Sequence, residues 1–86
     1  MRRIIYPGTF DPIHNGHLDI AKRTAELFDE LEFVVAMNSK KEPLFSVEKR
    51  VEMIKNSVIN IKNIKVSYFD GLVVDHAKKI NACSII

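Results

Sequence analysis

Short runs of apolar residues alternate along this chain with longer stretches whose apolar positions recur three or four residues apart. The short runs predict strands, at residues 4–6, 33–37, 64–68 and 83–86. The longer stretches predict amphipathic helices, at residues 18–28, 46–58 and 70–80. The elements therefore follow the order β-α-β-α-β-α-β. Strands separated by helices of this length imply right-handed crossovers and a parallel sheet.

The predicted fold is a three-layer, doubly wound α/β domain of the Rossmann-like type, with helices on both faces of the sheet. Residues 33–37 form a continuous apolar run, which is typical of a strand covered on both sides. Ser46 is the expected N-cap of the second helix. The chain ends at Ile86 inside an apolar run. We therefore expect residues 1–86 to form one domain that is incomplete at its C-terminus.

The composition of the chain argues against several classes of function. The net charge of +2 is too small to argue for nucleic acid as the main partner. The single cysteine, Cys83, excludes an internal disulfide and a four-cysteine zinc site, and indicates a reducing compartment. No apolar run approaches the roughly 20 residues of a membrane span, and Pro7-Gly8 interrupts the first run too early for a signal peptide. We expect a cytoplasmic protein with no nucleic-acid or membrane partner.

Candidate chemistry is concentrated between the first strand and the first helix, in residues 6–17. Ligands of open parallel sheets bind outside the carboxyl ends of the strands, where the strand order reverses. Gly8 would let backbone approach such a ligand, and Gly16 would do the same at the helix start. His17 falls in the first helical turn, where free amides and the helix dipole favour phosphate. Neither the dinucleotide fingerprint nor the P-loop, with its lysine, is present, so phosphate must be held in another way.

Structural alternatives stay open for several polar residues. His14 is also compatible with a surface or core-edge position, and a zinc site at His14 and His17 lacks a third ligand nearby. Asp11 fits a turn cap and a site residue equally well. We expect His76 to be structural or exposed, and Arg50 to form an ion pair on the second helix.

A resemblance rests on Gly8-Thr9-Phe10-Asp11-Pro12 followed by His14-x-Gly16-His17. This pattern is similar to the signature of the HxGH nucleotidyltransferase superfamily. Within it, the chain resembles bacterial phosphopantetheine adenylyltransferases over essentially its whole length, with further matches at residues 40–51, 69–72 and 83–86. Many members have threonine in place of His14, and residues 9–18 also resemble nicotinate-nucleotide adenylyltransferases. The family's Arg-Gly-Leu-Arg motif and its serine-rich phosphate segment would follow Ile86.

The resemblance implies adenylyl transfer from ATP to 4′-phosphopantetheine, giving dephospho-coenzyme A and pyrophosphate. It assigns His17 as the catalytic donor to the α-phosphate. It assigns ATP binding to a set of residues in the same loop and helix start: Gly8, Thr9, Phe10, His14, Gly16 and His17. It assigns phosphopantetheine binding to Thr9, Lys41 and Val73.

The same resemblance implies Mg²⁺ bound through the ATP phosphates with no protein metal site. It also implies coenzyme A as a feedback ligand and a homo-oligomer, hexameric in the family. Two alternatives stay open. One is another HxGH nucleotidyltransferase, such as the nicotinate-nucleotide enzyme. The other is an inactive fragment that self-associates through an unpaired strand edge.

Overall fold

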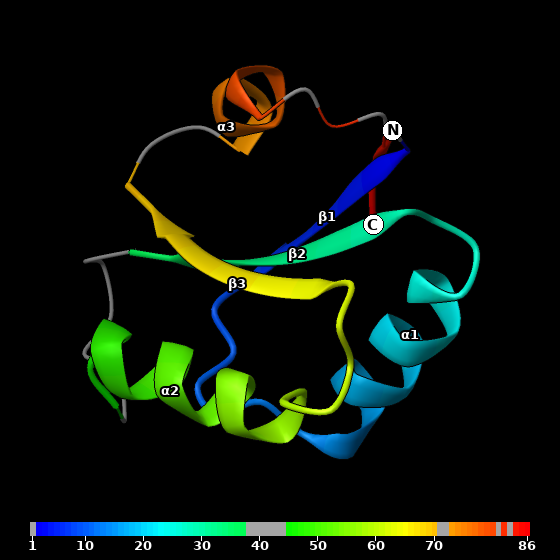
Figure 1. Cartoon of the computed structure of the whole chain (residues 1–86). Helices are drawn as coiled ribbons and strands as arrows, with labels where there is room; N and C mark the ends of the chain where they lie inside the picture. Colours follow the sequence, from blue (N-terminus) through cyan, green and yellow to red (C-terminus); the bar gives the residue numbers. More distant parts are fainter. Residues whose placement is uncertain (1, 38–44, 71–72, 81, 83) are drawn as a thin grey trace.

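A computed structural model describes residues 2–37, 45–70, 73–80, 82 and 84–86. Its elements follow the predicted order: β1 (Arg3–Gly8), α1 (Asn15–Ala25), β2 (Glu30–Ala36), α2 (Val47–Ser57), β3 (Ile64–Phe69), α3 (Val73–Lys79) and β4 (Ser84–Ile85). The four strands form one parallel sheet in the order β3-β2-β1-β4 (Figure 1). The predicted fold class is confirmed.

The strand order places a topological switch beside β1. The chain moves outward from β1 through β2 to β3, and then crosses back to add β4 on the other side of β1. β4 pairs with β1 through Ile4 and Ile5, and the amide of Ile86 also donates to the carbonyl of Ile5 at 3.0 Å. A ligand crevice is expected at such a switch, outside the carboxyl ends of the strands. The loop that leaves β1 lies there.

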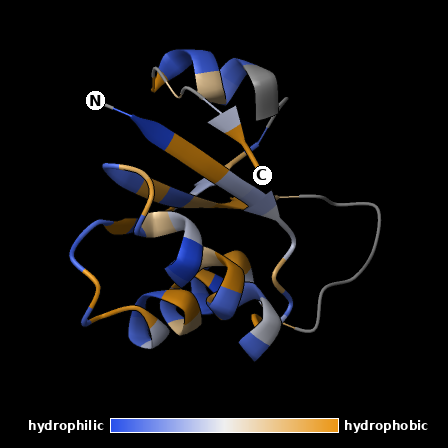
Figure 2. Cartoon of the chain, turned by 90° about the vertical axis from the view of Figure 1, so that its right-hand side faces the viewer, coloured by the Kyte–Doolittle hydropathy of each residue, from blue (hydrophilic) through white to orange (hydrophobic). Residues whose placement is uncertain are grey.

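The sheet is covered unequally on its two faces. α1 and α2 lie on one face and the short α3 lies on the other (Figure 1). Both helices of the first face interleave apolar and hydrophilic residues, as an amphipathic helix requires (Figure 2). The first face carries the larger core, whose fully buried members include Leu31, Phe33, Val35 and Ile54. The second face carries a smaller one around Ile5, Val34 and Ala77.

The ends of α1 and α2 show where local rules hold and where they fail. Ser46 is the N-cap of α2 as predicted, and its Oγ accepts from the amide of Lys49 at 3.2 Å. The prediction that the first helix continues to residue 28 is wrong, because α1 ends at Ala25. The Asn63 side chain donates to the carbonyls of Ala25, at 2.8 Å, and Phe28, at 3.3 Å. A distant residue thus supplies donors that a further helical turn would otherwise have provided.

β2 begins three residues before the predicted apolar run, and so includes two carboxylates. Glu30 is buried between Arg3 Nε, at 2.8 Å, and Lys65 Nζ, at 3.3 Å. Glu32 Oε2 lies 2.9 Å from His76 Nε2. Buried carboxylates need such partners. The sheet therefore extends further than the apolar pattern alone indicates. No helix of the described ranges is long and apolar enough to cross a bilayer.

Candidate functional site

The loop that leaves β1 folds back over the sheet at Phe10. Phe10 has a left-handed backbone with a φ of 48°, a conformation that bulky side chains rarely adopt. Its ring is buried and packs edge-on against Tyr6, Phe33 and His17, with centroid distances of 5.3, 5.2 and 5.0 Å. Aromatic packing at these distances holds the loop against the carboxyl end of β1. The ring of His17 is one wall of this cluster.

The two glycines of the loop make room for rings. A Cβ on Gly8 would lie 2.9 Å from Phe10 Cζ, and a Cβ on Gly16 would lie 2.9 Å from His14 Cε1. From the sequence, both glycines are expected to allow the close approach of a ligand. The structure supplies another reason, since the two positions are already closely approached by the side chains of Phe10 and His14.

His14 and His17 cap the start of α1 reciprocally. His14 is the N-cap, and its Nδ1 accepts from the amide of Gly16 at 3.0 Å. The Nδ1 of His17 accepts in turn from the amide of His14 at 3.1 Å. The two rings stack with centroids 3.6 Å apart. The amide of Gly16 is thus already bonded, although the sequence analysis expects free amides in this turn.

This cap determines the protonation of His17. Because Nδ1 accepts a hydrogen bond, the proton of the neutral ring must reside on Nε2. Burial lowers the pKa of His17 below its usual 6.5, and the neighbouring His14 lowers the pKa further. At neutral pH, His17 is therefore a neutral imidazole with one N–H to donate. It is half-buried among aromatic rings at the carboxyl end of β1, and lies outside the aliphatic core.

The side chain of Arg50, which lies in α2, contacts the same loop. It is only 3% exposed, and its Nη1 donates to the carbonyl of Thr9 at 2.9 Å and to that of Ala36 at 3.2 Å. Its Nε donates to the carbonyl of Phe45 at 3.1 Å. The predicted ion pair on α2 is wrong, because backbone carbonyls take the place of a carboxylate. One signal could have located it: Arg50 falls on the helix face that carries Val47 and Ile54.

Asp11 links the loop to the residue before the α2 N-cap. Its Oδ1 accepts from the amide of Phe45 at 2.9 Å. The sequence analysis left a turn cap and a site residue open for Asp11. In the structure this carboxylate joins two segments 34 residues apart, so it fixes the loop in place.

The remaining predicted site residues are only partly described. Thr9 is exposed on the loop, beside Gly8 and Phe10. Lys41 lies outside the described residues, and for Val73, the first residue of α3, only the backbone is described. His76 is buried against Glu32, so the structural option for this residue is confirmed. Within the described ranges, no three His, Cys, Asp or Glu side chains gather as metal ligands.

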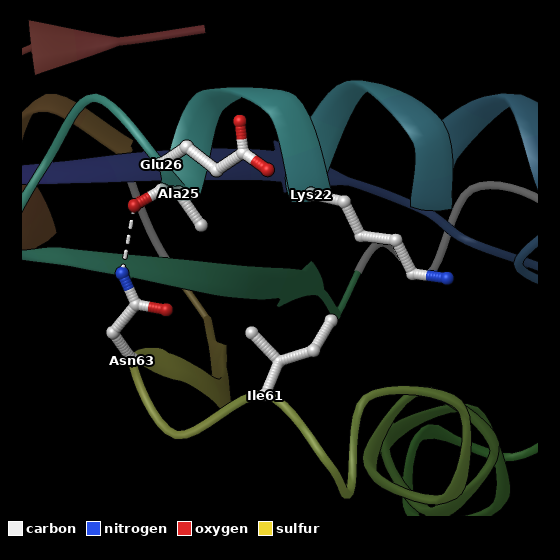
Figure 3. A pocket seen from close by; sticks show the side chains of 5 residues that line it. All are labelled: Lys22, Ala25, Glu26, Ile61 and Asn63. Carbon is white, nitrogen blue, oxygen red and sulfur yellow. Dashed lines mark hydrogen bonds between the residues drawn. The ribbon is translucent and has the colours of Figure 1, made fainter.

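A separate hollow of about 450 Å³ lies away from these residues, at the C-terminal end of α1. Figure 3 shows it between Lys22 of α1 and the C-cap Glu26 on one side and Ile61 and Asn63, just before β3, on the other. It opens where β3 starts, whereas the loop with His17 lies where β1 ends. No residue of the β1–α1 loop lines it. This hollow is therefore separate from the loop that carries His17.

The fold and the loop define a Rossmann-like α/β domain with a histidine-capped helix at its topological switch. The sequence profile of the cytidylyltransferase-like family matches residues 5–86, and the chain belongs to this family.

Relatives that match the chain along its whole length carry one name. The chain is 54% identical over 86 residues to the phosphopantetheine adenylyltransferase of Caldanaerobacter subterraneus subsp. tengcongensis, covering 100% of this chain and 54% of the relative. It is 46% identical over 86 residues to the phosphopantetheine adenylyltransferase of Dictyoglomus thermophilum, covering 100% and 52%. The chain thus spans about half the length of the curated relatives it matches.

Solved structures agree on the fold. A lipopolysaccharide core biosynthesis protein from Thermoplasma volcanium superposes with a TM-score of 0.76 at 27% identity, covering 99% of this chain and 72% of that one. A NadR protein in complex with NAD and AMP-PNP superposes with a TM-score of 0.71 at 30% identity, covering 80% of this chain and 20% of that one.

Proposed function

We propose that the protein transfers the adenylyl group of ATP to 4′-phosphopantetheine, forming dephospho-coenzyme A and pyrophosphate. The observation that carries the proposal is the cap bond to Nδ1, which leaves Nε2 as the donor of a neutral His17 at the switch point of the sheet. The names of the full-length relatives support the acceptor. The NadR structure, which was solved in complex with NAD and AMP-PNP, supports a nucleotide as the ligand.

The reaction needs positioning more than it needs a strong base. A phosphate oxygen of phosphopantetheine is already ionised at neutral pH. It attacks the α-phosphorus, while the bond to the β-phosphate oxygen breaks and its electron pair leaves with pyrophosphate. Bringing two anions within about 4 Å costs roughly 4 kcal/mol at an effective dielectric near 20. Donors and cations around the α-phosphate must offset that cost.

His17 would donate from Nε2 to an oxygen of the α-phosphate and strengthen that bond as charge develops there. A neutral imidazole suits this role, because the donor is already in place and no proton has to move first. Protonation at low pH would place a hydrogen on Nδ1 and break the bond from the amide of His14. The role therefore depends on the cap of α1.

The other assignments follow the family resemblance. Thr9, with the backbone of Gly8 and Phe10, would hold phosphate beside His17, while His14 and Gly16 would shape the helix start. Lys41 and Val73 would bind phosphopantetheine. Mg²⁺ would arrive on the ATP phosphates and neutralise part of their charge. Coenzyme A as a feedback ligand, a homo-oligomer and a cytoplasmic location belong to the same proposal.

The test measures pyrophosphate release from ATP with two acceptors, 4′-phosphopantetheine and nicotinate mononucleotide. It uses the 86-residue chain and a form extended to the length of its relatives. We expect the extended form to turn over phosphopantetheine and not nicotinate mononucleotide. We expect no appreciable turnover from the 86 residues alone, and sedimentation should show them to self-associate. Preference of the extended form for nicotinate mononucleotide would overturn the proposed acceptor.

A further inference from the structure

A buried guanidinium joins three segments that meet at the carboxyl ends of β1 and β2. Arg50 donates to the carbonyl of Thr9 in the loop after β1, and to that of Ala36, the last residue of β2. It also donates to the carbonyl of Phe45, just before the N-cap of α2. These acceptors stand 41, 14 and 5 residues away in sequence. The side chain therefore sets the relative positions of distant parts of the chain.

The chemistry of this contact indicates that Arg50 serves to position its acceptors and not to add to the stability of the fold. No carboxylate of the described ranges forms an ion pair with Arg50. Removing a cation from water without a counterion is costly, and an apolar side chain would cover the same helix face at lower cost. A guanidinium offers what an apolar group lacks, which is a planar set of donors with fixed directions. Its value here is the placement of three carbonyls.

The placement is transmitted to His17 by contacts of the loop. Thr9 precedes Phe10, whose buried ring lies 5.0 Å from the His17 ring. Asp11 adds a second tie to the same segment through the amide of Phe45. A shift of the Thr9 carbonyl would therefore move the wall on which the imidazole rests.

We propose that Arg50 is a positioning residue of the transferase site, which holds the Thr9 carbonyl and thereby sets the Thr9 hydroxyl and the His17 ring against the phosphates. This inference rests on the proposed function. Arg50 itself contacts neither substrate. Displacements of about 1 Å in such a site cost on the order of 100-fold in rate.

The experiment compares Arg50→Lys, which keeps the charge and loses the fork, with Arg50→Met, which loses both. Arg23→Met is the matched control, because Arg23 is an exposed arginine of α1 whose ion pair is with Asp19 of the same helix. The protein is the form extended to the length of its relatives. The measurements are kcat, KM for each substrate, the thermal midpoint, and recovery of kcat in the presence of guanidinium ion.

We expect kcat to fall about 100-fold in Arg50→Met and about 10-fold in Arg50→Lys, with KM for ATP changing less than 5-fold. Guanidinium, and not ammonium, should recover part of kcat in folded Arg50→Met. Arg23→Met should keep the original kcat. Wild-type kcat in a folded Arg50→Lys, or a loss of activity that only follows the unfolded fraction and that guanidinium leaves unchanged, would overturn the inference. Failure of both Arg50 variants to fold would also overturn the inference.

A readout without turnover separates this inference from the proposed function. The ¹H–¹⁵N signals of the His17 ring and of the Thr9 amide should move in Arg50→Lys, while those of the remote Glu32–His76 pair should not. Unmoved His17 and Thr9 signals would overturn the inference even if the wild-type protein is active. If those signals move and the wild-type protein does not use phosphopantetheine, only the proposed function fails.

Discussion

The two faces of the sheet differ in their chemistry, because the smaller apolar core of the face under α3 is accompanied by a carboxylate–histidine pair. On the face covered by α1 and α2, β2 presents Leu31, Phe33 and Val35 to an apolar core. On the face covered by α3, it presents Glu32, which pairs with His76. The two faces also differ in their histidines: His17, stacked on His14, lies at the aromatic edge of the first face, and His76 is buried in the second.

The two histidines differ in the contacts that hold their rings in place. His17 rests on rings, and its one directional contact comes from its own helix cap, which leaves Nε2 free of that cap. The Nε2 of His76 is already bonded to a carboxylate, and its Nδ1 is buried without a partner in the described structure. Apolar packing leaves a polar atom available for a ligand, whereas a buried pair consumes it. The first face therefore supports chemistry and the second supports the fold.

The largest effect is expected at His17. Replacing it by alanine in the extended form should lower kcat by about 10²- to 10³-fold, as loss of a preorganised donor does. The thermal midpoint should change little, because the ring is half-buried at the surface of the core. Steady-state pyrophosphate release and thermal unfolding measure the two quantities. His17→Ala with near-normal kcat would remove the catalytic role.

His76 provides the matched control on the other face. His76→Leu should lower the free energy of unfolding by about 2–3 kcal/mol, because it leaves the Glu32 carboxylate buried without a partner. Glu32→Leu should cost less, about 1–2 kcal/mol, since an imidazole is less costly than a carboxylate to leave buried without this partner. The folded variants should keep their kcat. Denaturant unfolding of the double variant should recover most of the loss, and simple additivity would show that the pair is not coupled.

A smaller effect is expected at Gly8, next to the ring of Phe10. Gly8→Ala places a methyl group 2.9 Å from the Phe10 ring, which should cost about 1–2 kcal/mol by overpacking. It should also lower kcat, since Phe10 can only move toward His17 or Phe33. Adding Phe10→Leu should reduce the combined loss below the sum of the two single losses. Unchanged stability in Gly8→Ala would show that the ring yields freely.

Local pattern was enough to predict the order of elements, because helical spacing and apolar runs are properties of neighbouring residues. It failed at the end of α1 and at the start of β2. There the outcome depends on Asn63 bonding the carbonyls of Ala25 and Phe28, and on His76 satisfying Glu32. Such pairings join residues far apart in sequence, and no local period encodes them.

The candidate site shows the same division. The loop and His17 were predicted from the strand-to-helix position and from the resemblance. The reciprocal cap was not, although its three-residue spacing is that of a capping box. Histidines are unusual in that motif, where serine, threonine and acidic residues prevail. Arg50 was misassigned, because an arginine on a helix usually pairs with a nearby carboxylate and here meets carbonyls of other segments.

Burial, and then the neighbouring His14, lower the pKa of His17 and so determine how pH acts on it. Its pKa is lower in the folded chain than in the unfolded chain, so folding disfavours protonation of this ring. The contribution to stability is constant above pH 6.5 and declines as the pH falls from there toward the folded pKa. In the folded chain the cap bond should be lost only as the pH falls through the lowered pKa of His17, because protonation places a hydrogen on Nδ1.

The measurement that tests the account most directly is the pH titration of the His17 ring by ¹H–¹⁵N correlation spectroscopy. At pH 7.5 the ring should be neutral and carry its proton on Nε2, and its titration midpoint should lie below 6.5. A proton on Nδ1, or a midpoint at or above 6.5, would contradict a ring that the helix cap holds ready to donate.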